Sequence, residues 1–190
     1  MWSTKNIGAT NGNTAESWYG DYYAWGETET KDDYSWSTYK YANGANNKLT
    51  KYCNVSKFGN NGFTDGLTQL VPKDDDAATV TNSAWRMPTE EDFEELVAGT
   101  TSSWVTGYNG ISGLKGKVFT SKINGNTLFI PAAGVRYDSG IDYIGSCCFL
   151  WSSSLYLDNP NNAYYLDFNS GSIGMSNSNR CDGFSVRPVC

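Results

Sequence analysis

Hydrophobic positions follow a helical spacing in one short stretch of the first half of the chain. Phe93, Leu96 and Val97 recur at intervals of three and four residues, which places apolar side chains on one side of a helix. Thr89 and Asp92 form a pair resembling a capping box just before this pattern. The spacing therefore predicts a helix that begins at Thr89.

A second, shorter helix is predicted just upstream. Three consecutive aspartates at 74–76 precede the segment 77–80 (AATV). Carboxylates are favourable at a helix N-terminus because of the helix dipole, so we interpret these acids as a helix start rather than as a metal site. The preceding 70 residues are rich in aromatics, Gly and Asn, with a candidate strand at 22–25 and long loops over 43–66.

From residue 115 onward the pattern changes to short apolar runs separated by turns. Segments 117–120 and 127–130 flank Asn124-Gly125, a dipeptide typical of β-hairpin turns. Four further candidate strands are bounded by Gly, Asn or Ser: 149–152, 163–168, 172–175 and 184–187. Two helices followed by antiparallel strands predict a single α+β domain over residues 1–190, with many long loops.

Composition excludes several kinds of function. The 190 residues contain no histidine, which removes His-dependent catalytic pairs and His-ligated metals. The net charge of −6 argues against a nucleic-acid partner, which needs a basic face. No apolar run is long enough to insert in a membrane, and the first residues lack the features of a signal peptide.

A break in composition divides the chain. Residues 1–122 contain 10 Lys, 7 Glu and 1 Gln, whereas residues 123–190 contain none of the three. One interpretation is a secreted β-rich surface that favours short polar side chains. The other lies in the codons: substitution at the adenines of Asn codons reaches Tyr, Ser, Asp, Gly, Cys, Phe, Ile and Leu, but never Lys, Glu, Gln, Met or Trp. Trp151 and Met175 are then fixed scaffold positions.

Motifs along nearly the whole chain resemble one family. Residues 85–96 (WRMPTEEDFEEL) are similar to the helix-two signature of C-type lectin folds of the formylglycine-generating-enzyme type, and residues 75–78 (DDAA) resemble the preceding helix. Together with these, four further segments resemble the Fibrobacter major paralogous domain, a group found in gut bacteria and their phages: 19–27, 128–134, 150–154 and 185–189.

Within this group, residues 134–190 are similar to the variable region of proteins diversified by retroelements. Such proteins change adenine-encoded positions by error-prone reverse transcription and bind ligands with the altered side chains. The resemblance implies a C-type lectin fold with a scaffold over 1–133 and a variable, ligand-binding region over 134–190. It also implies a non-catalytic, monomeric domain, displayed on a phage virion or bacterial surface as part of a larger protein, that recognises a protein or glycan on a cell surface.

Two criteria select sixteen candidate ligand-binding residues: whether the residue type can arise from an Asn codon by substitution at its adenines, and where the residue lies in the chain. Tyr and Phe offer large contact areas at low entropy cost, and short polar side chains adapt around them. We expect these side chains to share one exposed face, although a structural role in a strand remains the alternative for each Tyr. No catalytic residue, metal ligand or cofactor is assigned. The candidates are Asp142, Tyr143, Cys147, Phe149, Tyr156, Asp158, Tyr165, Asp167, Ile173, Ser176, Asn177, Ser178, Asn179, Cys181, Asp182 and Phe184.

A second set of residues is expected to be scaffold. We interpret most of the tryptophans, together with one phenylalanine and one arginine, as core or structural positions. Of the adjacent Tyr164 and Tyr165, one is expected to face inward and the other outward. The expected scaffold residues are Trp18, Trp25, Trp85, Phe93, Trp104, Trp151 and Arg187.

Two other functions stay open: a non-diversified surface or carbohydrate-binding module of the same fold, and a formylglycine-generating-type enzyme. That enzyme chemistry needs a reactive cysteine pair late in the fold. Cys147, Cys148 and Cys181 lie there, but no Lys or His is near in sequence to lower a thiol pKa. The segment 159–161 (NPN) lacks the Glu of the calcium-lectin Glu-Pro-Asn motif, so we interpret it as a turn rather than a calcium site.

Overall fold

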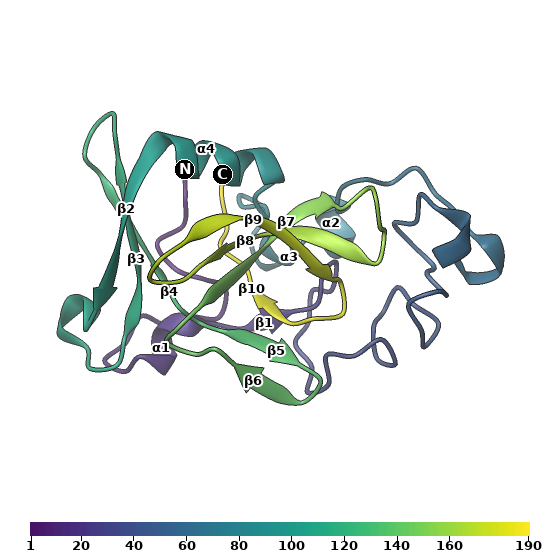
Figure 1. Cartoon of the computed structure of the whole chain (residues 1–190), viewed down its shortest axis with the longest axis horizontal. Helices are drawn as coiled ribbons and strands as arrows, with labels where there is room; N and C mark the ends of the chain where they lie inside the picture. Colours follow the sequence, from purple (N-terminus) through teal and green to yellow (C-terminus); the bar gives the residue numbers. More distant parts are fainter.

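Three β-sheets of unequal size carry the fold in the computed structural model, which describes residues 1–190 (Figure 1). All neighbouring strands run antiparallel except β10 and β7, which are parallel. The largest sheet has the order β1 (Tyr22–Tyr23), β10 (Phe184–Ser185), β7 (Cys148–Leu155), β8 (Asn162–Phe168) and β9 (Ile173–Asn179). The second contains β2 (Thr100–Thr106), β3 (Lys115–Ser121) and β4 (Thr127–Pro131), and the third β5 (Val135–Tyr137) and β6 (Gly140–Asp142).

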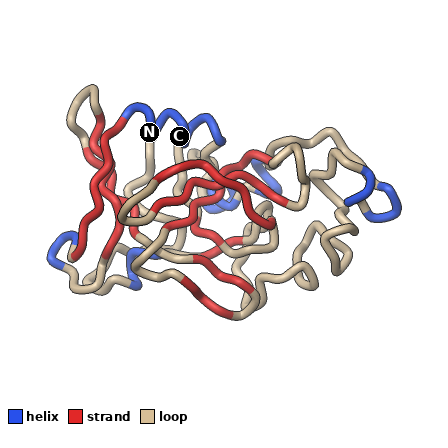
Figure 2. The backbone as a smooth tube through the Cα atoms, viewed as in Figure 1, coloured by secondary structure: helices blue, strands red, loops and turns tan.

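Helices are few and short, and loops make up much of the first half. Figure 2 shows that the chain between β1 and the first helices of the central region runs mostly as loop. The α-helices are α1 (Glu16–Tyr19), α2 (Pro72–Asp75), α3 (Ala77–Thr81) and α4 (Glu90–Gly99). Three 3-10 turns complete the set: η1 (Ser56–Phe58), η2 (Asn60–Gly62) and η3 (Tyr108–Gly110). The expected α+β class is confirmed, and no helix has the length and hydrophobicity needed to cross a bilayer.

Side-chain caps fix where the central helices begin. Thr89 accepts a hydrogen bond from the backbone N–H of Asp92, and the Asp92 carboxylate accepts one from the backbone N–H of Thr89 at 2.7 Å. This reciprocal capping box confirms the predicted start of α4. Asp76 caps α3 by accepting from the backbone N–H groups of Ala78 (2.8 Å) and Thr79 (3.0 Å).

The neighbouring Asp75 has a different role, which sequence pattern did not show. Its buried carboxylate accepts hydrogen bonds from the hydroxyls of Tyr41 and Tyr52 and pairs with Lys51. Burial opposes the charge, yet these three donors together hold the pKa of Asp75 below its ordinary value. Asp75 therefore anchors the loop of residues 41–52 to the central helices.

The large sheet has a separate core on each side. On one side, α4 and the β3–β4 hairpin cover Cys148, Leu150, Leu166 and Phe168 with a cluster that includes Phe93. On the other side, a larger cluster forms around three fully buried rings: Trp25, Trp151 and Phe184. Each indole donates a 2.8 Å hydrogen bond to the opposite segment, from Trp25 Nε1 to the carbonyl of Ser152 and from Trp151 Nε1 to the carbonyl of Tyr23.

The expected scaffold residues are packed as predicted. Trp18, Trp25, Phe93 and Trp151 are buried, while Trp85 and Trp104 are partly buried against the core clusters. Arg187 is fully buried and donates to Asn6 Oδ1 at 2.8 Å and to the carbonyl of Ser3 at 3.0 Å. These bonds help to hold the two ends of the chain together, and Figure 1 shows the ends side by side next to α4.

The strands differ from the predicted ones mainly at their ends. The predicted segment 184–187 forms only the two-residue β10, because the chain beyond Ser185 leaves the sheet toward the N-terminal segment. β7 and β9 extend beyond the predicted 149–152 and 172–175. The polar strand β2 and the short β5–β6 hairpin were not predicted, because their sequences show little apolar alternation.

Replacing Asp76 with Ala should lower the free energy of unfolding by about 2 kcal/mol, because it removes the cap of α3 and leaves buried N–H groups unpaired. One of these N–H groups belongs to Met87, which donates to the Asp76 carboxylate at 2.8 Å. The exposed Asp74→Ala is the matched control and should change the stability little. Urea unfolding measures both variants, and equal losses would contradict the role of Asp76.

Candidate ligand-binding face

The register of β7, β8 and β9 decides which side chains share a side of the sheet. Phe149 pairs with Asp167, and Tyr165 pairs with Ser176. Ser178 lies opposite Ala163, two positions from Tyr165 along β8. Directly opposed residues point to the same side, so these side chains lie on the side of the sheet away from α4. Tyr164 and Tyr165 lie on opposite sides, as expected.

One more aromatic ring extends this surface beyond the strands. The Tyr143 ring, 55% exposed, lies 6.2 Å from the Phe149 ring. The side chains of the strand residues are partly exposed, and most of them are small or polar. We call this surface the open face, consisting of Tyr143, Phe149, Tyr165, Asp167, Ser176 and Ser178.

The open face rests on a buried aromatic base. The Phe184 ring lies 5.3 Å from Phe149, 4.9 Å from Tyr165 and 4.1 Å from Trp151, against which it stacks. Phe149 and Tyr165 are themselves 5.7 Å apart. Closely packed rings have few alternative arrangements, so they hold the backbone of the open face in one position. This position should not depend on which short side chains point outward from the strands.

A glycine positions the segment that carries Asp142 and Tyr143. Gly134 has a φ of +71°, and a Cβ atom there would lie 2.2 Å from the carbonyl oxygen of Asp142. Its N–H donates to the carbonyl of Cys147 at 2.9 Å. Only glycine allows this close approach, which places Asp142 and Tyr143 beside the start of β7. Both side chains are exposed.

Burial raises the pKa of several acids and of one thiol near the open face. Burial raises the pKa of Asp167, and burial together with the Asp167 charge raises the pKa of the Cys147 thiol. Burial also raises the pKa of Asp182 to about 6, although its carboxylate accepts a hydrogen bond from Ser178 Oγ at 2.7 Å. The edge of the open face thus contains a carboxyl group that titrates near neutral pH.

The structure corrects three of the sixteen candidates. Phe184 is fully buried because β10 lies between β1 and β7, where its ring stacks on Trp151. Cys181 and Asp182 lie in the turn after β9 and are covered by the loop of residues 34–36 and by the β5–β6 hairpin. The prediction that these three side chains lie on an exposed face is therefore wrong, although Cys181 and Asp182 line a hollow beside that face.

Four other candidates lie away from the open face. Ile173 packs toward the α4 side of the sheet, and Asn177 accepts a hydrogen bond from Asn162 on that side at 2.7 Å. In the β7–β8 loop, Tyr156 packs against Tyr164 at 5.3 Å, and its hydroxyl donates to Asp158 at 3.3 Å. The prediction of one shared face is wrong for these four. Residues of β9 alternate between the two sides of the sheet, which places Ile173 and Asn177 on the α4 side, and Tyr156 and Asp158 lie in a loop beyond the sheet.

The three remaining candidates, Asp142, Cys147 and Asn179, lie at the border of the open face. Cys147 precedes β7 and lies near Asp167, and Asn179 is exposed at the end of β9. Asn179 lines a hollow of about 230 Å³ next to the open face. Together, these residues extend the surface on which the open face lies.

The residues that line this hollow and that sequence reasoning missed include Trp36, Tyr137 and Asp138. Tyr137 and Asp138 lie within residues 134–190, and both are reachable from Asn codons, so the same criterion could have selected them. Trp36 carries no such signal because it comes from the first half of the chain. Only the three-dimensional fold brings it to this place.

The two buried cysteines late in the chain lie in different parts of the core. Cys148 and Cys181 are buried in different core clusters, and burial raises the pKa of both thiols. No group of three or more Cys, Asp or Glu side chains could hold a metal ion. The segment 159–161 forms a turn in which Asn159 Oδ1 accepts from the N–H of Asn161 at 3.2 Å, in agreement with its interpretation as a turn.

Comparison with known proteins leaves this surface to be interpreted from its own chemistry. No protein-family model, no curated protein and no solved structure matches the chain.

Because the carboxyl group of Asp182 is buried, we expect the free energy of unfolding to fall as the pH rises from about 4 to about 6. Its folded-state pKa is about 6, above the ordinary Asp value, so the folded protein holds a proton that the unfolded chain releases. Asp182→Asn keeps an acceptor for Ser178 and removes this effect. Relative to wild type, the variant should gain about 3 kcal/mol between pH 4 and pH 7.

The measurement is urea unfolding of both proteins across this pH range. The matched control is Asp158→Asn, which removes one exposed carboxylate elsewhere on the surface. Parallel pH profiles for wild type and Asp182→Asn would contradict the assignment.

Proposed function

We propose that this chain is a non-catalytic ligand-binding domain with a C-type lectin fold, and that its open face carries diversified side chains that recognise a receptor or a cell surface. The observation that carries the proposal is the gathering of six independently selected candidates on one surface. Tyr143, Phe149, Tyr165, Asp167, Ser176 and Ser178 lie over a base of buried rings. A rigid base with adaptable polar and aromatic side chains is the usual organisation of a binding surface.

The arrangement of elements supports the C-type lectin part of the proposal. Helices α3 and α4 lie at the two segments that resemble the family's helices. The segment that resembles the variable region supplies β7, β8 and β9. Helix α4 of the scaffold segment covers one side of the sheet that β7, β8 and β9 form, and the open face lies on the other side.

The same geometry argues against the enzyme alternative. The late cysteines would have to supply a reactive thiolate pair, but Cys148 and Cys181 lie on different sides of the sheet and both are buried. Burial raises both thiol pKa values, which disfavours the nucleophilic form. The other alternative, a non-diversified binding module of the same fold, would use the same open face. It differs from the proposal only in that no retroelement diversifies the side chains of this face.

Tolerance to substitution tests whether the open face can vary. Ser176→Tyr adds a partly exposed side chain and should change the free energy of unfolding by less than about 1 kcal/mol. Phe184→Ser, which the same codon mechanism could produce, removes a buried ring and should cost about 4 kcal/mol. Urea unfolding compares the two variants. A loss at Ser176 as large as the loss at Phe184 would contradict the proposal.

Selection from a library tests binding itself. Display libraries that vary Tyr143, Asp167, Ser176 and Ser178 over the residues reachable from Asn codons should yield binders to an immobilised test protein such as lysozyme. A matched library that varies the four candidates away from the open face, Tyr156, Asp158, Ile173 and Asn177, should yield far fewer. Equal yields, or no binders from the first library, would overturn the proposed binding surface.

The gene tests the diversification separately from binding. We expect a reverse transcriptase gene nearby, with a near-copy of the coding sequence for residues 134–190 that differs only at adenines. Sequencing the neighbourhood of the gene is the measurement. If the copy is missing, or differs at other bases, the diversification is contradicted. The protein is then interpreted as a non-diversified binding module of the same fold.

A further inference from the structure

A small hollow with aromatic walls adjoins the open face. It measures about 230 Å³ and is lined by Tyr34 and Trp36 from the first half of the chain, Tyr137 and Asp138 from the β5–β6 hairpin, and Cys181 and Asp182 from the turn after β9. Tyr137 is 36% exposed, and its pKa is raised by burial and by the nearby Asp182, Tyr165 and Tyr143. Tyr137 therefore stands between the hollow and the open face.

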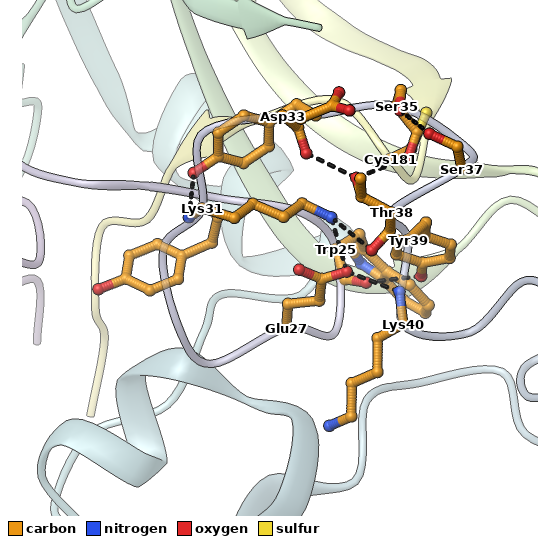
Figure 3. Close-up of polar contacts among 12 residues, drawn as sticks. Trp25, Glu27, Lys31, Asp33, Ser35, Ser37, Thr38, Tyr39, Lys40 and Cys181 are labelled. Carbon is orange, nitrogen blue, oxygen red and sulfur yellow. Dashed lines mark hydrogen bonds and ion pairs between the residues drawn. The ribbon is translucent and has the colours of Figure 1, made fainter. Parts of the chain in front are cut away.

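Tyr34 and Trp36 form one wall of the hollow, and they belong to a loop over residues 27–40 that side-chain hydrogen bonds hold together. Figure 3 shows the Glu27 carboxylate accepting from Lys31 Nζ at 2.9 Å and from the backbone N–H of Lys40 at 2.8 Å. These bonds tie the two ends of the loop together. In the same view, Thr38 Oγ1 donates to the carbonyl of Asp33 at 2.6 Å. The wall is thus fixed before any ligand arrives.

The opposite wall is fastened directly to this loop. Tyr34 and Asp138 exchange backbone hydrogen bonds of 2.8 and 3.2 Å. Gly183, next to Asp182, packs so closely under the Tyr34 ring that a Cβ atom there would lie 2.6 Å from it. The hollow is a preformed feature of the fold, because three distant segments close around it with backbone contacts.

The hollow contains negative charge without a counter-ion. Asp182 is 5% exposed, and its carboxylate accepts hydrogen bonds from the Ser178 hydroxyl and the Cys181 thiol but pairs with no cation. Asp138 also lines the hollow and forms no ion pair. The nearest cations are engaged elsewhere: Lys31 pairs with Glu27, and Arg136 lies over the rings of Tyr22 and Tyr34.

We propose that the hollow binds a basic side chain, the guanidinium or ammonium group of an Arg or Lys on a protein ligand that contacts the open face. This inference rests on the proposed function and adds the chemistry of one contact. Asp182 and Asp138 supply the charges that pair with the cation, and the faces of Trp36 and Tyr137 supply cation–π attraction. Two carboxylates would repel an anionic group.

The size of the hollow and its position fit a side chain rather than a free molecule. Ordinary small-molecule pockets begin at about 300 Å³, so this hollow takes one side-chain head and little more. Because Tyr137 borders the open face, a protein lying on that face can place a long basic side chain over this residue. The net charge of −6 attracts basic ligands toward this surface as a whole.

Binding of the cation is coupled to a proton. The groups that face Asp182 are Ser178 from β9, Tyr165 from β8, Tyr137 and Asp138 from the hairpin, and Cys181 beside it. None of them carries positive charge. A bound cation stabilises the ionised Asp182, whose pKa is about 6 in its absence, so affinity should increase as the pH rises through 6.

A pair of isosteric probes tests the inference. N-acetyl-arginine amide carries the guanidinium cation, and N-acetyl-citrulline amide has nearly the same shape without the charge. Titration of the isotope-labelled protein by NMR should show the arginine probe shifting the amides of Tyr137, Asp138 and Asp182 at millimolar concentration. The citrulline probe should shift them at least about tenfold less, since only the charged head gains the ion pair.

Three variants locate the contact. Asp182→Asn and Asp138→Asn should each weaken the arginine probe about tenfold, and Asp182→Asn should also abolish the increase in affinity between about pH 5 and pH 7.5. The matched control, Asp158→Asn, removes one negative charge from the surface outside the hollow and should leave binding unchanged. Unfolding curves confirm that each variant is folded before it is titrated.

The outcomes separate this inference from the proposed function. Equal binding of the two probes, or equal effects of the three variants, overturns the cation site. If the cation site fails while the library varied on the open face still yields binders, the proposed function stands without it. If the arginine probe binds as expected and the library yields no binders, the cation site stands and the open face fails.

Discussion

The reciprocal hydrogen bonds of Trp25 and Trp151 are the constraint on which the rest of the structure depends. Each indole reaches across to a backbone carbonyl beside the other, so the aromatic start of the chain and the middle of β7 fix one another. β10 has to fit between these two segments, which forces Phe184 into the stack against Trp151. The open face is built on that stack. A buried indole N–H without its acceptor costs about 1–3 kcal/mol, so both bonds favour this one arrangement of the two segments.

Buried arginine extends this constraint to the loops of the first half. Arg180 follows β9, is fully buried, and lies over the rings of Trp25 and Tyr39 at 5.4 Å each. It donates to the carbonyl of Tyr52 at 3.0 Å. Burial lowers the pKa of this arginine, and the surrounding rings offset part of the cost of its charge. One cation therefore connects the sheet to loops that have few regular hydrogen bonds of their own.

The predictable parts of the molecule are those that local chemistry determines. The start of α4 follows from Thr89 and Asp92, and the β3–β4 hairpin from Asn124-Gly125, because caps and turns depend on a few adjacent residues. The candidate site depends on register, which sequence alone did not supply. Codon reach selects Ile173 and Ser176 equally, but pairing with β8 sends them to opposite sides of the sheet. Phe184 was misjudged because its burial depends on β1 and β7. Trp36 was missed because most of its neighbours in the hollow lie about 100 residues or more away in the chain.

The side-by-side ends of the chain have a consequence for orientation. Cys190 donates its backbone N–H to the carbonyl of Met1 at 2.9 Å, and Trp2 packs on Phe93 of α4. Both ends therefore emerge on the α4 side of the large sheet, opposite the open face. Any polypeptide joined at either end would start from the same small area on the α4 side. A linker of any length would therefore keep such a polypeptide away from a ligand bound to the open face.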